Sequence, residues 1–125
     1  MTVTFYDLES GVQTDGPTIP SSAPVYDVRT LIPLSDSRLL LVGFDKASFQ
    51  IDDLGHHAKG WLGVLDLDTG ELAAIAVREA SWGTAVPLPD RRVLLIGGAG
   101  VSECPTPGGG TAPCFGPATG VDVLR

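Results

Sequence analysis

Two segments of the chain, residues 30–43 and 84–97, are copies of one another placed 54 positions apart. Their sequences, TLIPLSDSRLLLVG and TAVPLPDRRVLLIG, are identical at eight of fourteen positions. A second motif is also repeated, as FYDLESG over residues 5–11 and VLDLDTG over residues 64–70. Repeats of this period indicate one supersecondary unit stacked on copies of itself, as in propellers and solenoids. The repeat therefore constrains the architecture of the chain much more than its ligand.

The repeated unit is expected to be made of β-strands. The 125 residues include 16 glycines and 10 prolines, and short apolar runs alternate with Gly, Pro, Asp and Ser clusters. Such punctuation favours an all-β fold over a helical one. In DLESG and DLDTG, Asp7 and Asp66 are expected to form turns, and the glycine that ends each motif supplies a positive φ.

Four strands are expected in each unit. The complete copy has them at residues 28–34, 38–42, 61–67 and 71–77, and the following copy has the first three at 83–88, 92–96 and 120–124. Segments 2–8 and 12–14 correspond to the third and fourth strands of a preceding copy. The second strand carries an unbroken apolar run, LLLV, so both of its faces should be covered by neighbouring sheets. Residues 44–60 and 99–118 are expected to be long loops.

These motifs resemble the kelch repeat. The pattern is Leu-x-Asp-x-Arg, an apolar strand with Gly-Gly, a loop, and Val-x-Asp-x-x-Thr-Gly, seen here as LSDSRLLLVGF…GWLGVLDLDTG and LPDRRVLLIGG…GVDVLR. The first copy has Gly43-Phe44 in place of two glycines. The resemblance implies a β-propeller whose blades are four-stranded antiparallel sheets, and a non-catalytic binding scaffold. It also implies that the two long loops lie on one face, where recognition is expected.

Counted in blades, the resemblance implies a partial propeller of about two units. Residues 1–16 form the back half of one blade, 24–77 a complete blade and 82–125 the front three strands of the next. Two blades leave apolar blade faces uncovered. We therefore expect self-association, or contact with further blades of a propeller.

Charge and hydropathy narrow the range of partners. The formal net charge is −7, with no basic stripe, which disfavours nucleic acid. The chain contains no apolar run of 18 residues, so no membrane span is expected. Its N-terminus lacks the basic start and apolar stretch of a signal peptide, so none is expected. A protein or a carbohydrate is the expected kind of partner. No cofactor motif is present: the glycine clusters lack the lysine of a phosphate-binding loop.

One polar segment contains the only two histidines. His56 and His57 follow Asp52 and Asp53, and Asp45 precedes them. Adjacent histidines on extended backbone point in opposite directions, and the aspartates lack calcium-loop spacing, so no metal site is predicted. These five residues are the candidate binding-face loop. Because it is expected to be solvated, replacing both histidines by alanine should change stability by less than ~0.5 kcal/mol.

The two cysteines flank a loop that cannot form its own core. Cys104 and Cys114 enclose PTPGGGTAP, and a disulfide across this spacing would contribute roughly 3 kcal/mol on the chain-entropy model. The alternative is a pair of free thiols. A disulfide would favour an exported protein. Trp61 and Trp82 could stack on a sugar, but aromatic residues at strand starts are more often packing residues.

The competing function is enzymatic. Some kelch-like propellers are copper radical oxidases or sugar-modifying enzymes, and copper chemistry of that kind needs a tyrosine, a histidine and a tyrosine-linked cysteine. This chain offers Tyr6, Tyr26, the histidine pair and two cysteines in one loop. Stoichiometric copper in the purified protein would favour this alternative.

Overall fold

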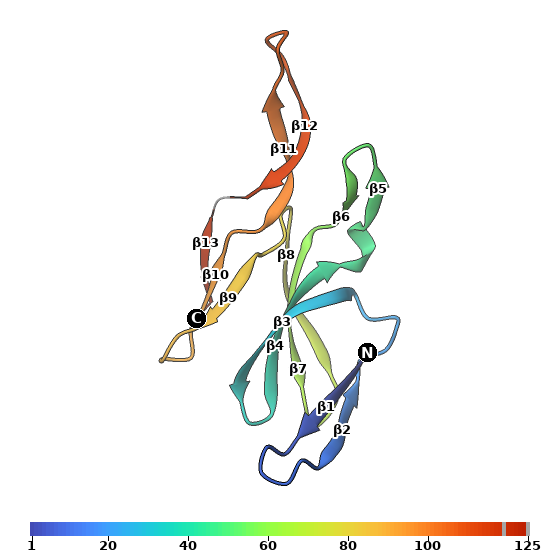
Figure 1. Cartoon of the computed structure of the whole chain (residues 1–125), viewed down its shortest axis with the longest axis vertical. Coiled ribbons are helices and arrows are strands. Elements are labelled where there is room, and N and C mark those ends of the chain that lie inside the picture. Colours follow the sequence, from blue (N-terminus) through green and yellow to red (C-terminus); the bar gives the residue numbers. More distant parts are fainter. Residues whose placement is uncertain (119, 125) are drawn as a thin grey trace.

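The computed structural model describes residues 1–118 and 120–124 and shows an all-β protein (Figure 1). Its sheets are antiparallel, and the only helical element among the described residues is a single 3-10 turn, η1 (Lys46–Ser48). The all-β prediction is therefore confirmed. Over the same residues, no helix has the length and apolar character needed to cross a bilayer.

A four-stranded sheet forms the centre of the structure. Its strands are β3 (Val25–Ser35), β4 (Arg38–Asp45), β7 (Gly60–Asp66) and β8 (Leu72–Arg78), paired in that order. These are the four strands predicted for the complete repeat. The largest differences are at β3 and β4. Strand β3 begins three residues earlier than predicted, at Val25, and β4 ends three residues later, at Asp45.

Two smaller sheets correspond to parts of the same unit. The strands β9 (Thr84–Pro87), β10 (Val93–Ile96) and β13 (Val121–Leu124) pair in the order of β3, β4 and β7. At the other end, β1 (Thr2–Tyr6) pairs with β2 (Gln13–Thr18), as β7 pairs with β8. No sheet closes on itself in the described part of the chain. The propeller therefore stays a proposal.

Both faces of the four-stranded sheet are covered, because consecutive residues of β4 belong to different cores. Leu40 and Val42 pack in a core shared with the three-stranded sheet, which contributes Val93 and Leu95. Leu41 packs in a second core with Trp61, and Val3 of β1 packs against that core. All three β4 side chains are at most 3% exposed. The expected burial of both faces is confirmed for this strand.

The repeated turns have the same hydrogen bonds. In the first turn, Asp7 Oδ1 accepts from the backbone N–H groups of Glu9 and Ser10, and in the second Asp66 Oδ1 accepts from those of Asp68 and Thr69. Gly11 and Gly70 complete the turns at φ 71° and 74°. The expected turn-forming role of both aspartates is confirmed.

These bonds predict an acid dependence of stability. The hydrogen bond from the Ser10 backbone N–H lowers the pKa of Asp7 below its ordinary value. The hydrogen bond from the Thr69 backbone N–H does the same to the pKa of Asp66. The unfolded chain then binds more protons, so this stabilisation is complete above the unfolded pKa near ~4 and is lost as pH falls through the folded pKa. We expect the thermal midpoint to fall below about pH 4. Asp66→Asn should make that fall shallower and Asp68→Asn should not; equal slopes in a pH series of melts would contradict the assignment.

The two long segments predicted as loops are β-hairpins, so that prediction was wrong. One hairpin pairs β5 (Gln50–Asp52) with β6 (Gly55–His57), and the other pairs β11 (Ala99–Pro105) with β12 (Thr111–Pro117). Their sequences are polar or rich in Gly and Pro, and the pairing is made by backbone hydrogen bonds rather than by an apolar side-chain pattern. A disulfide joins Cys104 to Cys114 across the second hairpin, which confirms the predicted pairing.

One arginine links the four-stranded sheet to the three-stranded sheet. The Arg78 guanidinium, at the end of β8, donates to the carbonyl oxygens of Ala80, Ser81 and Gly97 and to Asp122 Oδ2 of β13. It also lies 4.6 Å from the centre of the Trp82 ring, whose Nε1 donates to the same Asp122 oxygen. Trp82 is 8% exposed and packs in the core between the two sheets.

Candidate ligand-binding cleft

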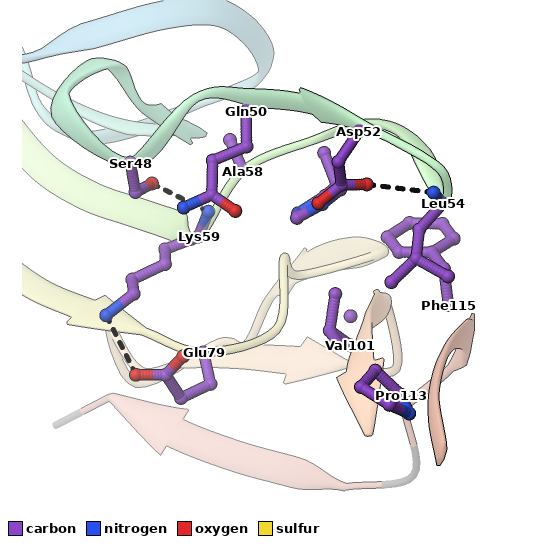
Figure 2. A pocket seen from close by; sticks show the side chains of 12 residues that line it. Ser48, Gln50, Asp52, Leu54, Ala58, Lys59, Glu79, Val101, Pro113 and Phe115 are labelled. Carbon is purple, nitrogen blue, oxygen red and sulfur yellow. Dashed lines mark hydrogen bonds and ion pairs between the residues drawn. The ribbon is translucent and has the colours of Figure 1, made fainter. Parts of the chain in front are cut away.

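The two hairpins extend from the same end of the sheets and enclose a pocket between them (Figures 1 and 2). The pocket has a volume of about 260 Å³. Asp52 and Leu54 of the first hairpin line one side, and Pro113 and Phe115 of β12 line the other. Lys59 and Glu79 also line the pocket, and Lys59 Nζ pairs with Glu79 Oε1 at 2.8 Å. Residues 44–60 and 99–118 therefore meet at one site, as expected.

A larger cleft of about 650 Å³ adjoins this pocket and has aromatic walls. Tyr26 stacks on Phe44 at 5.6 Å between ring centres, and Phe49 contacts Tyr26 edge-on at 5.4 Å. The His56 ring lies next in this series, 5.9 Å from Phe49. Phe115 lines the cleft from the second hairpin and is 44% exposed. Exposed rings of this kind offer stacking surface to a ligand.

A bulge in β3 places charged groups beside the aromatic rings. The pairing of β3 with β4 shifts register between Tyr26 and Thr30, and Asp27 lies there at φ 48°, in the left-handed region. Bulges change the direction of side chains and are frequent near functional sites. Asp27 pairs with Arg29 at 2.8 Å, and the Arg29 guanidinium lies 5.2 Å from the centre of the Phe44 ring. The cleft therefore offers an acidic, a basic and several aromatic groups.

Tyr26 adds a neutral hydrogen-bonding group to the same wall. Burial raises the pKa of its phenol above the ordinary value, and the charge of Asp27 acts in the same direction. The hydroxyl therefore keeps its proton at neutral pH and can both donate and accept a hydrogen bond.

The two histidines are held differently. His57 Nε2 lies 2.9 Å from Asp52 Oδ2, and the ring packs at 6.2 Å from Phe115 of the other hairpin. Only 12% of the His57 side chain is exposed, so the expected solvated position is wrong for this residue. Hydrogen bonds from His57 and from the Leu54 backbone lower the pKa of Asp52. His56, on the opposite side of β6, is exposed.

The predicted binding-face residues are only partly brought together. Asp52, His56 and His57 line the pocket or the cleft, whereas Asp53 is exposed in the turn of the first hairpin and Asp45 lies at the end of β4 before η1. Over residues 1–118 and 120–124, no three His, Cys, Asp or Glu side chains cluster as a metal site. The arrangement suits recognition by stacking and hydrogen bonding.

Sequence reasoning missed most of the cleft walls. Tyr26, Phe44, Phe49 and Phe115 are four of the six Phe and Tyr residues of the chain, and all four lie at the hairpin end. Phe44 and Phe49 lie in segment 44–60, Phe115 lies in segment 99–118, and Tyr26 lies at the start of β3, before the strand predicted for residues 28–34. An aromatic residue that does not follow the period of a strand was the signal that could have identified them.

The difference between the histidines gives a paired prediction. His57→Ala should destabilise the protein by about 1 kcal/mol, because it removes a packed ring and a hydrogen bond, whereas His56→Ala should stay within ~0.5 kcal/mol. Chemical denaturation of the two single variants measures this difference. Equal effects would show that His57 is not packed between the hairpins.

Comparison with protein-family models, with curated proteins and with solved structures found no significant match. The function is therefore argued from the geometry of the cleft.

Proposed function

We propose that this chain is a kelch-like β-propeller module that acts as a non-catalytic binding scaffold. The strand order of the central sheet recurs in the three-stranded sheet, which supports stacked repeat units. The observation that carries the binding role is the aromatic-walled cleft at the hairpin end. Loops and hairpins at one end of a rigid sheet scaffold are where recognition usually occurs.

The chemistry of the cleft favours a protein segment or a carbohydrate as ligand. Phe49 and Phe115 are exposed and can stack on a sugar ring or on an apolar side chain, while Asp27, Arg29 and Tyr26 can form hydrogen bonds. The net charge of −7 opposes binding of a polyanion such as nucleic acid.

The enzymatic alternative gains no support from the arrangement of the cysteines. A tyrosine-linked cysteine needs a free sulfur, and Cys104 and Cys114 are bonded to each other. Tyr6 lies on β1, outside both the pocket and the hairpin cleft.

A ligand search with matched variants tests the proposal. The purified protein is applied to a glycan array and to a displayed-peptide library, and each bound ligand is measured again with Phe49→Ala, Phe115→Ala and the control Ile75→Ala. All three replaced side chains are exposed, so the fold should be retained. We expect affinity losses of about tenfold or more for the two cleft variants and none for the control. Ligands that bind all three variants equally, or no ligand from either library, would contradict the proposal.

A further inference from the structure

The charged side chains that line the pocket and the cleft bond to one another. They form three contacts, each of 2.8 or 2.9 Å between nitrogen and oxygen: Asp27 with Arg29, Lys59 with Glu79, and Asp52 with His57. Each of the three acidic groups that the structure places on these walls therefore has a donor within the chain itself. A charged ligand would have to compete with one of these internal partners.

The electrostatics of the cleft disfavour ions of either sign. The net charge of −7 repels an anion. It attracts a cation, but at the cleft a cation meets the Arg29 side chain, which is 64% exposed. The Arg29 guanidinium also lies 5.2 Å from the centre of the Phe44 ring, where a ligand cation would otherwise bind. The cleft therefore suits a ligand without net charge.

The pair of Asp27 and Arg29 retains hydrogen-bonding atoms for such a ligand. Both Nε and Nη2 of Arg29 bond to the same carboxylate oxygen, Asp27 Oδ2, so Asp27 Oδ1 and Arg29 Nη1 lie outside the pair. The Asp27 side chain is 47% exposed, and both residues line the cleft. An acceptor and a donor held beside each other match adjacent hydroxyl groups, because a hydroxyl both donates and accepts.

Aromatic rings on the same walls match the other half of a sugar. A sugar ring has an apolar face of C–H groups with hydroxyl groups around its edge, so it can stack on an aromatic ring while its edge forms hydrogen bonds. Phe49 and Phe115 line the cleft and are 41% and 44% exposed. The Tyr26 phenol, in edge-on contact with Phe49, adds a group that donates and accepts. An apolar peptide side chain would use the rings alone.

We propose that the cleft binds a neutral saccharide, whose rings stack on Phe49 and Phe115 and whose hydroxyl groups bond to Asp27, Arg29 and Tyr26. The cleft volume of about 650 Å³ lies within the range of about 300–1,000 Å³ that is typical of small-ligand sites. The inference rests on the proposed binding function and names the class of its ligand.

A glycan array tests this ligand class when it carries neutral glycans beside glycans with sialic acid or sulfate, and is run with the displayed-peptide library. We expect neutral glycans to bind, with a Kd that changes less than about twofold between low and high salt, because binding neutralises no charge. A preference for acidic glycans, or peptide ligands alone, would overturn the inference and leave the proposed binding function standing. The absence of any ligand from both libraries would contradict both.

Two variants of the charged pair distinguish a neutral ligand from an ion by the sign of their effect. Arg29→Ala and Asp27→Asn should each weaken binding of a captured neutral glycan by about fivefold or more, because each removes a charge-assisted hydrogen bond. A cationic ligand would instead bind more tightly to Arg29→Ala, and an anionic ligand more tightly to Asp27→Asn.

The controls separate this effect from loss of the fold or of charge in general. Asparagine is tolerated at the left-handed φ of Asp27, and circular dichroism checks that both variants are folded. Asp53→Asn removes the same charge from an exposed turn outside the cleft and should leave the Kd unchanged. Tighter binding by either folded cleft variant, or unchanged binding by both, would overturn the proposal.

Discussion

Replacing Trp61 by alanine is expected to lower the free energy of unfolding by about 3–5 kcal/mol. Trp61 is 1% exposed and packs with Leu41 and Leu65 in the core beneath β1. Its indole lies over Gly63 on the same strand, where an added Cβ would collide with the ring and with the Ala73 carbonyl oxygen. Alanine would leave a cavity in this core. Denaturant titration measures the loss.

Two further variants define this prediction. Trp61→Phe should retain part of the lost stability, because a smaller ring still fills part of the core. Leu8→Ala is the control for loss of an apolar side chain, since Leu8 is 98% exposed and should change stability little. A Trp61→Ala loss below about 1 kcal/mol would mean that this core is not formed as described.

Arg78→Ala is expected to lower the free energy of unfolding by about 2–4 kcal/mol. The guanidinium satisfies three backbone carbonyl groups and pairs with Asp122, and its removal leaves those acceptors without this donor where the two larger sheets meet. The side chain is 25% exposed, so solvent replaces some of the lost bonds and the expected loss is below the sum of the separate hydrogen bonds. Thermal and denaturant unfolding of the variant give the value.

Arg78→Lys separates charge from geometry. Lysine keeps the positive charge near Asp122 but lacks the planar fork that reaches several acceptors, so it should recover less than half of the loss. If lysine restored full stability, the arginine would act only as a charge. If neither variant lost stability, the contact between the two sheets would not depend on this side chain.

The sheets could be predicted from the sequence because their signal is repeated. The LLLV run of β4 and the DLDTG turn each have a copy elsewhere in the chain, so strand and turn assignments support one another. The covered faces followed from the same run, because Leu40, Leu41 and Val42 do not alternate with polar residues and the structure buries all three.

The hairpins could not be predicted, because their pairing leaves little trace in side-chain pattern. Gln50–Asp52 and Gly55–His57 are three-residue strands, and β12 contains Pro113 and Pro117, which argue against a strand in a sequence reading. Both hairpins are two-stranded, with free edges, where proline is tolerated. Only the spacing of Cys104 and Cys114 pointed to order in the second segment.

The location of the candidate site was predicted from the sequence, but most of the residues that line it were not. The long segments were expected to share one end of the molecule, and they do. The polar residues of the first segment attracted attention because histidine and aspartate carry recognisable chemistry. The aromatic residues of the cleft come from β3, β4, the segment after η1 and β12, and only the fold brings Tyr26 and Phe115 to one cavity.

The central claim is that the four-stranded sheet packs between two other sheets, with alternate residues of β4 facing opposite sides. Methyl–methyl nuclear Overhauser effects measure this directly. We predict contacts from Leu41 to the β1 side of the molecule, through Val3, and contacts from Leu40 and Val42 to Val93 and Leu95. Contacts from both Leu40 and Leu41 to the same neighbouring sheet, or from neither to any other sheet, would contradict the stacked arrangement.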